Sequence, residues 1–212
     1  MKVVAFNGSP HKEGNTYFAI KTVANELEKE GIEVEIIQVG DKLIRDCTAC
    51  NGCIKNRDEK CVIDGDEVNQ WIQKMKEADG IILGSPIHFA GIGAAMKAFL
   101  DRAFYVATSN NSMFRHKVGA TVVAVRRSGG VAAYEQLNNY ICYSEMLMPT
   151  SSYWNVIHGT VPGEAQKDEE GTQTMSTLGR NMAWLMKLVQ FGKGKIKEPE
   201  RAEKISTNFI RD

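Results

Sequence analysis

Two kinds of hydrophobic pattern alternate along this chain. Short, nearly continuous apolar runs rich in β-branched residues occur at residues 3–6, 34–39, 81–83 and 118–125, with a weaker run near 152–157. Such runs predict strands that helices cover on both faces. Because stretches of helical period separate the runs, we expect right-handed βαβ crossovers and one parallel sheet.

The helical stretches carry apolar residues at the i, i+3, i+4 and i+7 spacing of helices that bury one face. Clear sets lie at 20–27, 68–75, 96–103 and 175–189, and a less regular helix is expected at about 131–146. Asn15 or Thr16 is expected to cap the first helix and Gly31 to end it. The pattern predicts an α/β fold, with a doubly wound five-stranded sheet in a three-layer α/β/α sandwich. The order 2-1-3-4-5 fits, although sequence alone does not determine strand order.

Length and charge narrow the organisation of the chain. Its 212 residues suit one large domain, which we expect at 1–191, followed by a C-terminal tail or oligomerisation arm at 192–212. Lys plus Arg and Asp plus Glu both total 26, so no net basic field exists for nucleic acid or an anionic membrane. No apolar run approaches the ~20 residues that span a bilayer, and no signal peptide is recognisable. We therefore expect a cytoplasmic protein without nucleic-acid or membrane partners.

A loop rich in glycine and hydroxyl groups follows the first predicted strand. It reads Gly8-Ser9-Pro10-His11-Lys12-Glu13-Gly14-Asn15-Thr16 and leads directly into a helix. The free amides and the positive dipole end of a helix N-terminus suit a phosphate. The spacing matches neither a P-loop nor a G-x-G-x-x-G fingerprint, so we expect a single phosphate monoester. The alternative is a plain turn between strand and helix.

The third predicted strand ends in a similar loop, Gly84-Ser85-Pro86-Ile87-His88-Phe89-Ala90-Gly91. In the order 2-1-3-4-5 the first and third strands are neighbours whose chains leave toward opposite faces, and ligands bind at such a switch point. A flat heteroaromatic ring next to a phosphate, as in FMN, would fit the two loops together. The fourth strand ends in Arg126-Arg127-Ser128-Gly129-Gly130, which suits flavin carbonyl oxygens or NAD(P)H phosphates, or is simply a basic surface pair.

Four of the five cysteines are crowded into one segment. Cys47, Cys50 and Cys53 follow C-x-x-C-x-x-C spacing, and Cys61 lies eight residues further on. This spacing is typical of ferredoxin-type [4Fe–4S] ligands. A Cys₄ zinc site and four plain thiols remain alternatives, the last with Cys61 as a small buried hydrophobe. Cys142 lies in a helical stretch and is expected in the core.

These pieces resemble the flavodoxin-like NAD(P)H-dependent FMN reductases, and within them the iron–sulfur flavoproteins. The resemblance rests on the first two loops, the run Met96-Lys97-Ala98-Phe99-Leu100-Asp101-Arg102 and the cysteines, and covers about 1–130. It implies a flavodoxin-like fold, assembled as a homodimer or homotetramer. It also implies residues that hold the FMN phosphate, residues around the flavin ring and metal ligands: Ser9, His11, Gly14, Asn15 and Thr16; Pro86, Ile87, His88, Phe89, Gly91, Arg127, Ser128 and Gly129; and Cys47, Cys50, Cys53 and Cys61.

The implied activity is electron transfer from NAD(P)H through FMN to a flavin, a quinone or a similar acceptor. Redox chemistry belongs to the cofactor, so no catalytic acid, base or nucleophile is assigned to the chain. If the cysteines carry a [4Fe–4S] cluster, ferredoxin becomes a partner. The alternatives are a non-catalytic flavodoxin-like or ferredoxin-linked electron-transfer protein, and a regulatory metal-binding protein with an empty crevice. The acceptor and the choice between NADH and NADPH remain open.

Overall fold

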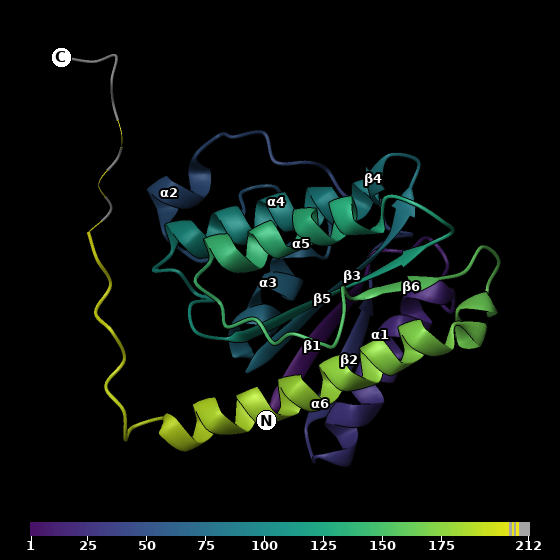
Figure 1. Cartoon of the computed structure of the whole chain (residues 1–212). Coiled ribbons are helices and arrows are strands. Elements are labelled where there is room, and N and C mark those ends of the chain that lie inside the picture. Colours follow the sequence, from purple (N-terminus) through teal and green to yellow (C-terminus); the bar gives the residue numbers. More distant parts are fainter. Residues whose placement is uncertain (204, 206, 208–212) are drawn as a thin grey trace.

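Five parallel strands form the middle layer of the molecule (Figure 1). The structure, a computed structural model, describes residues 1–203, 205 and 207. The strands are β1 (Lys2–Asn7), β2 (Glu33–Gln38), β3 (Gly80–His88), β5 (Val118–Val125) and β6 (Val156–His158), in the order β2-β1-β3-β5-β6. A two-residue strand, β4 (Gly91–Ile92), pairs antiparallel with the end of β3. Apart from this hairpin, the order is the predicted 2-1-3-4-5.

Helices cover both faces of the sheet, as predicted. One face packs against α1 (Asn15–Lys29) and α6 (Glu169–Gly192); the other packs against α3 (Val68–Glu77), α4 (Ala94–Ser109) and α5 (Gly130–Tyr143) (Figure 1). Each face has its own hydrophobic core. On the α3–α5 side, the rings of Phe6, Trp71 and Phe99 pack with centroids 4.6 to 6.3 Å apart. The methionine stripe of α6 fills the other core.

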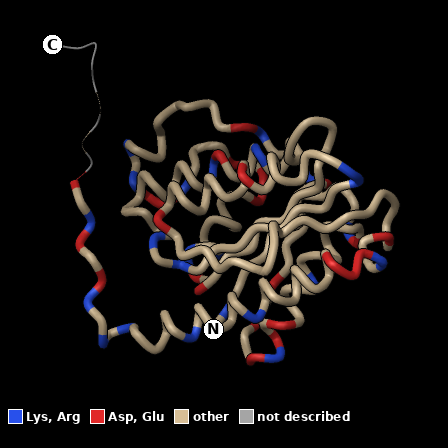
Figure 2. The backbone as a smooth tube through the Cα atoms, viewed as in Figure 1, with Lys and Arg blue, Asp and Glu red and all other residues tan. Residues whose placement is uncertain are grey.

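The central strands explain the apolar runs of the sequence. Residues 3–6 of β1 and every residue of β5 are buried, because helices pack on both sides of them. Charged side chains are confined mainly to the helices and loops around the sheet, with both signs interspersed (Figure 2). Within the described residues, no helix is both long and apolar enough to cross a membrane.

Three local predictions were wrong or incomplete. Gly14, without a side-chain cap, stands at the N-cap of α1, whereas Asn15 and Thr16 lie inside the helix. The last strand begins only at Val156, because Ser151 and Asn155 form a polar turn before it, joined by a 2.7 Å hydrogen bond. The sequence pattern also missed two short helices, α2 (Gly52–Asn56) and η1 (Glu164–Lys167). The prediction that Gly31 ends α1 holds, with φ at +74°.

The C-terminal segment runs from the end of α6 along the side of the molecule where α2 lies (Figure 1). Residues 193–203 form neither helix nor strand. They contact the body through Arg115 Nη2, which donates to Pro199 O at 3.1 Å, and through His116 and Glu198, whose side chains lie 3.1 Å apart. Of the predicted arm, residues 204, 206 and 208–212 lie outside the described residues. An oligomerisation role for this segment stays a prediction.

Candidate functional site

The turn at the carboxyl end of β1 is shaped by amide side chains from β1 and β2. Asn7 Nδ2 donates to Gln38 Oε1 at 2.7 Å and to Lys12 O at 3.2 Å. Asn7 Oδ1 accepts the Ser9 N–H at 3.1 Å, and Gln38 Nε2 donates to Ser9 O at 2.6 Å. Ser9 is buried, and its Oγ accepts the N–H of His11 at 3.1 Å. These bonds fix the first loop without any contribution from a ligand.

Thr16 presents an unpaired hydroxyl in the first turn of α1. Its Oγ1 is buried, and no described residue offers it a hydrogen bond. Buried polar atoms nearly always have a partner, and the Thr16 hydroxyl at this helix end is available as a donor to a bound anion. The first N–H groups of an α-helix also lack partners within the helix. A phosphate at this N-terminus would accept from both kinds of donor.

Asn15 has a different task from the one predicted for its side chain. Its Nδ2 donates to Val161 O at 3.1 Å, and its Oδ1 accepts the N–H of Ala165, also at 3.1 Å. The side chain therefore ties the long 158–172 loop to the start of α1. In this arrangement its backbone N–H is the group left for a phosphate. His11 is exposed beside the loop.

The first and second loops meet backbone to backbone. Asn7 pairs with Gly84 in the parallel register of β1 and β3, and Gly8 N–H donates to Gly84 O at 2.8 Å. Gly93 N–H donates to Ser85 Oγ at 3.1 Å and so closes the second loop. A Cβ on Gly8 would lie 2.8 Å from that of Met96, so glycine is needed for this approach. The loops that follow β1 and β3 therefore lie side by side at the carboxyl edge of the sheet.

The second loop is a tight hairpin that carries an aromatic ring into solvent. Pro86 and Ile87 are half-buried, whereas His88 and Phe89 are exposed. Phe89 has a φ of +61° and is 101% exposed. A bulky residue in this region of φ is an outlier of the kind that clusters at functional sites. A planar ligand that covers the Phe89 ring would remove its apolar surface from water.

The third loop reaches the same edge. Gly129 has a φ of +88°, and a Cβ placed on it would lie 4.0 Å from Ile87 Cδ1. The side chains of Arg127 and Ser128 are exposed beside it. The structure thus brings the three predicted loops together at the carboxyl edge of the sheet. The residues there fit FMN, with helix-end donors for its phosphate and mixed apolar and polar groups for its ring.

The four clustered cysteines border one small cavity under the α2 segment. It is also lined by Arg102, Tyr105 and Val62. A Cβ on Gly52 would lie 2.4 Å from Val62 Cγ1, so the turn with Cys50 and Cys53 packs directly on the segment that carries Cys61. Ala49 and Asn51 have positive φ angles, as expected where a short loop must bend sharply.

The thiols differ in their surroundings. Backbone hydrogen bonding from Gly52 holds the pKa of the exposed Cys50 thiol below its ordinary value. Burial raises the pKa of the Cys53 thiol, which donates to Ser109 Oγ at 3.9 Å. Within the described residues, no three His, Cys, Asp or Glu side chains are already gathered around one point for a metal ion. By their soft donor atoms alone, the four thiols suit a metal cluster. Cys142, expected in the core, is exposed.

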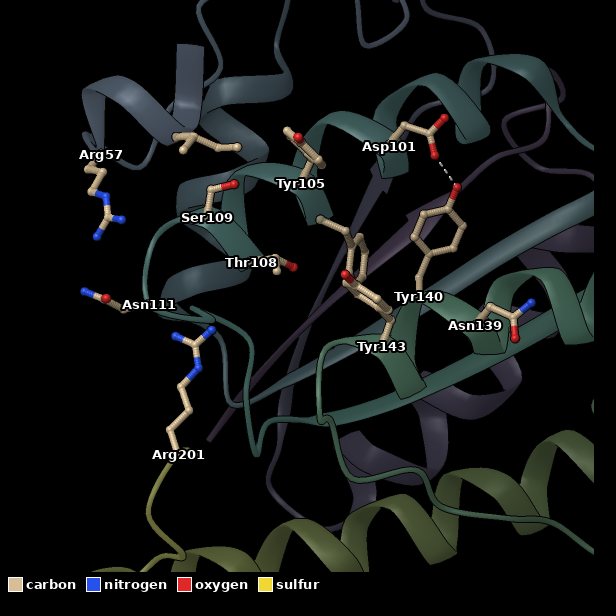
Figure 3. A pocket seen from close by; sticks show the side chains of 12 residues that line it. Arg57, Asp101, Tyr105, Thr108, Ser109, Asn111, Asn139, Tyr140, Tyr143 and Arg201 are labelled. Atoms are coloured by element: carbon tan, nitrogen blue, oxygen red, sulfur yellow. Dashed lines mark hydrogen bonds between the residues drawn. The ribbon is translucent and has the colours of Figure 1, made fainter. Parts of the chain in front are cut away.

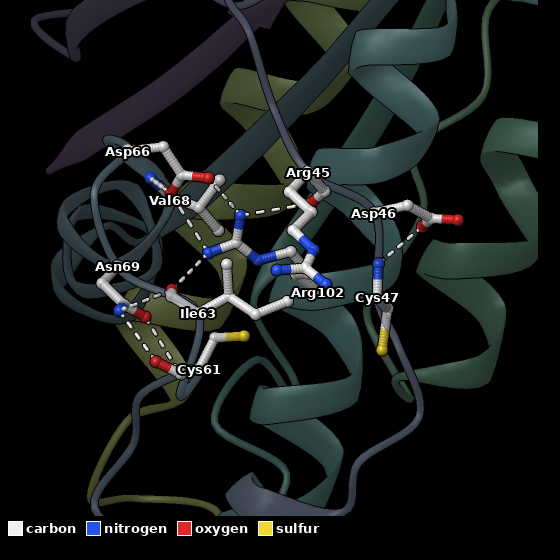
Figure 4. Close-up of polar contacts among 9 residues, drawn as sticks. All are labelled: Arg45, Asp46, Cys47, Cys61, Ile63, Asp66, Val68, Asn69 and Arg102. Atoms are coloured by element: carbon white, nitrogen blue, oxygen red, sulfur yellow. Dashed lines mark hydrogen bonds and ion pairs between the residues drawn. The ribbon is translucent and has the colours of Figure 1, made fainter.

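Partly buried polar contacts hold the cysteine segment in place (Figure 4). Asn69 on α3 accepts the Cys61 N–H at 2.8 Å through Oδ1 and donates from Nδ2 to Cys61 O at 2.9 Å. Arg102 on α4 forms an ion pair with Asp66. Burial alone would lower the pKa of Arg102, but the hydrogen bonds to Asp66 and the charge of that carboxylate outweigh it and raise that pKa. From the sequence, Arg102 was named only as the last residue of the run that begins at Met96, and no role was assigned to it.

A larger cavity of about 750 Å³ lies between α4 and α5 (Figure 3). Aromatic side chains line it, with one arginine from the α2 end and one from the C-terminal segment: Phe104, Tyr105, Tyr140, Tyr143, Arg57 and Arg201. Tyr140 OH donates to Asp101, and burial together with this bond raises the pKa of Tyr140, which therefore stays neutral. Sequence reasoning missed this cavity, because these aromatics look like ordinary core positions on two separate helices.

Comparison with known proteins decides the family. A family model described as NADPH-dependent FMN reductase matches residues 1–161. The chain belongs to this family. An iron–sulfur flavoprotein of Methanocaldococcus jannaschii is 36% identical over 197 residues, which cover 90% of this chain and 100% of the relative. The chain is therefore a flavoprotein oxidoreductase of an FMN-binding, NAD(P)H-dependent family, with curated relatives named iron–sulfur flavoproteins.

Solved structures show the same fold. RosB with bound 8-demethyl-8-formylriboflavin-5'-phosphate has a TM-score of 0.66 at 16% identity, over 100% of this chain and 92% of that one. An archaeal flavodoxin has a TM-score of 0.57 at 18% identity, over 88% of this chain and 99% of its own. The predicted flavodoxin-like fold is confirmed.

Proposed function

We propose that this protein oxidises NAD(P)H by means of FMN bound at the carboxyl edge of the sheet, and passes the electrons to a small oxidised acceptor. The observation that carries the proposal is the buried, unpaired hydroxyl of Thr16 at the N-terminus of α1. Thr16 lies in the first turn of α1, directly after the loop whose Gly8 shares a backbone hydrogen bond with the second loop. The family match supports the same cofactor.

The chain's own residues would bind and orient the cofactor. The Thr16 hydroxyl and the first amides of α1 would hold the phosphate, with Ser9, His11 and Gly14 shaping the loop. Asn15 would add its backbone N–H and keep the 158–172 loop closed over α1. When bound, FMN supplies the hydride-accepting ring, and the protein determines its orientation and access.

The ring would lie against the second and third loops. Pro86, Ile87, Phe89 and Gly91 provide apolar and backbone surface on one side, and His88 a polar edge. Arg127, Ser128 and Gly129 lie on the neighbouring loop, where a guanidinium can face a carbonyl oxygen or a phosphate of the nicotinamide cofactor. Since these side chains are exposed, NAD(P)H and the acceptor can reach the same face in turn.

We further propose that Cys47, Cys50, Cys53 and Cys61 ligate a [4Fe–4S] cluster. Their shared cavity and the names of the curated relatives support this assignment. Such a cluster would let electrons leave one at a time, so ferredoxin is a suitable partner. All five cysteines are free thiols, which suits the reducing cytoplasm.

We also propose a homodimer or homotetramer, without nucleic-acid or membrane partners. The balanced charge of the chain supports the second part. Large apolar side chains on the outer helices support the first, because Tyr143, Trp184 and Phe191 are each about two-thirds exposed, at 65% to 69%.

Anaerobic purification tests the proposal. We expect a brown protein with flavin and iron–sulfur absorption, four iron atoms per chain by analogy to the ligand set, and fast bleaching of the flavin by NADPH or NADH in a stopped-flow instrument. A flavin that neither nicotinamide reduces would favour a non-catalytic electron carrier. A protein without flavin would refute the proposed site.

A further inference from the structure

Arg102 is a buried cation that the proposed FMN site does not use. It lies on α4, is 1% exposed, and ranks among the largest fully buried side chains of the described residues. Removing a guanidinium from water is costly unless its charge and its N–H groups are compensated. Its surroundings therefore have to explain why it is there.

The outer nitrogens of Arg102 join the two segments that carry cysteines. Nη1 donates to Arg45 O at 3.3 Å, two residues before Cys47, and Nη2 donates to Ile63 O at 2.6 Å, two residues after Cys61. Both nitrogens also donate to Asp66, a bidentate pair. One guanidinium on a rigid helix thus sets the spacing between the segments (Figure 4).

The inner nitrogen of Arg102 has no such explanation. Nε is buried, and no hydrogen-bond partner for it exists among the described residues. The side chain lines the cavity bordered by Cys47, Cys50, Cys53 and Cys61. A donor left unpaired beside four thiols matches an acceptor that only the loaded site supplies, such as a thiolate or sulfide.

We propose that Arg102 is a positioning residue and the counter-charge of the cysteine site. The proposal rests on the proposed cluster. A thiolate-ligated cluster is anionic and becomes more negative on reduction, so a buried cation beside it stabilises the reduced form and raises its reduction potential. Asp66 faces the same guanidinium and opposes that effect. Charge removal at the two positions therefore has opposite consequences.

Three variants test whether the two charges shift the reduction potential of the cluster in opposite directions. Arg102→Met removes the cation, and Asp66→Asn removes the anion but keeps a hydrogen-bond acceptor. Arg102→Lys keeps the positive charge but loses the two outer nitrogens with which the guanidinium donates to both segments. Arg115→Met, at an arginine paired with Glu145 away from the cysteines, serves as the matched control. Each protein is prepared anaerobically with its cluster, and its midpoint potential is measured by dye-mediated titration followed by electron paramagnetic resonance. Iron per chain is determined in parallel.

At a fixed solution potential, we expect Arg102→Met to lower the ratio of reduced to oxidised cluster about tenfold, which is 59 mV for one electron. Asp66→Asn should raise that ratio, and Arg102→Lys should leave it near the wild-type value while iron retention falls. A merely structural role would make Arg102→Met and Asp66→Asn both lose iron with no opposite shifts, which would overturn the proposal. If Arg102→Met does not fold, the other two variants still decide.

The same experiment separates this proposal from the one on which it rests. A wild-type chain that takes up no cluster refutes the proposed cluster and this role together. A fully loaded set with equal potentials refutes only the role of Arg102.

Discussion

The two candidate sites of this protein are built in different ways. The edge proposed for FMN is formed by turns that directly follow β1, β3 and β5, so the register of the sheet alone brings them together. The cysteine cavity is formed by an irregular segment that depends on contacts to α3 and α4, such as Asn69 with Cys61 and Arg102 with Asp66. One site follows from sheet topology, and the other from packing between distant elements.

This difference implies that the sites can be damaged separately. The backbone hydrogen bonds of the FMN loops do not involve the cysteine segment, and the cysteine cavity shares no lining residue with the three loops. Substitutions that reduce FMN binding and iron content equally would show that the two sites are not independent. The variants below run from the largest expected effect to the smallest.

Cys53→Ser should abolish cluster binding and leave FMN in place. The thiol of Cys53 is the buried member of the set, and a hydroxyl is a poor ligand for iron in such a cluster. Iron, sulfide and flavin content after anaerobic purification measure the effect. Cys142→Ser, at an exposed cysteine outside the cavity, is the control and should keep both groups. Loss of both iron and flavin in Cys53→Ser would contradict the independence of the two sites.

Gly40→Ala should weaken FMN binding by about 100-fold, which is about 2.7 kcal/mol. A Cβ at this position would lie 2.2 Å from the carbonyl carbon of Ser9, so the phosphate loop must move. Iron content should not change. Flavin fluorescence titration gives the dissociation constant. Gly192→Ala, where a Cβ would meet only Ile196 at 3.4 Å, is the control. An unchanged constant would mean that the first loop does not bind the phosphate.

Thr16→Val should weaken FMN binding by about tenfold, the effect of losing one hydrogen bond to a charged group. Without FMN, the same change should keep or raise the free energy of unfolding, because it removes a buried hydroxyl that has no partner in the described chain. Urea unfolding of the flavin-free protein and a flavin titration measure the two effects.

Thr22→Val on the same helix is the matched control for Thr16. Its hydroxyl donates to Phe18 O at 2.9 Å, so its loss should affect stability slightly and FMN binding not at all. If Thr16→Val destabilises the flavin-free protein and leaves the flavin affinity unchanged, the hydroxyl has a structural role instead.

Asp168→Asn should have the smallest effect, about 0.5 kcal/mol of unfolding free energy at pH 7, because Asn can still cap α6 but loses the negative charge at its N-terminus. Burial would raise the pKa of Asp168, but hydrogen bonds from the N–H groups of Gly171 and His158 outweigh it and lower that pKa. A carboxyl with a lowered pKa stabilises the fold above its unfolded value of about 3.9 and loses this contribution as pH falls through the folded value.

The difference between wild type and Asp168→Asn should therefore be full at pH 7 and shrink in strong acid. Urea unfolding at several pH values measures it. If the difference in unfolding free energy grew as pH falls, the pKa of Asp168 would be raised in the folded protein and not lowered. Iron content should be the same in both proteins.

Most of the fold could be predicted because its signals are local. The apolar runs at β1 and β5 mark buried strands, and the glycine-rich turns after β1 and β3 mark the edge where both end. The cap of α1 was mispredicted for the opposite reason. The Asn15 side chain forms hydrogen bonds with the backbone of Val161 and Ala165, about 150 residues away in the sequence. The residues next to Asn15 in the sequence give no indication of those partners.

The cysteine site shows the same limit more strongly. Cysteine spacing alone indicated the candidate ligands, but not the contact of Gly52 with Val62 or the bonds from Arg102 to the backbone of Arg45 and Ile63. These contacts depend on how α4 packs over the segment. Spacing predicts candidate ligands, whereas the groups around them have to be seen in the folded chain.

A difference electron-density map from crystals grown with FMN tests the central claim most directly. We predict the phosphate at the first amides of α1 beside Thr16, and the ring against the loops at Phe89 and Gly129. Flavin density in the aromatic cavity between α4 and α5, with the edge of the sheet empty, would contradict the account.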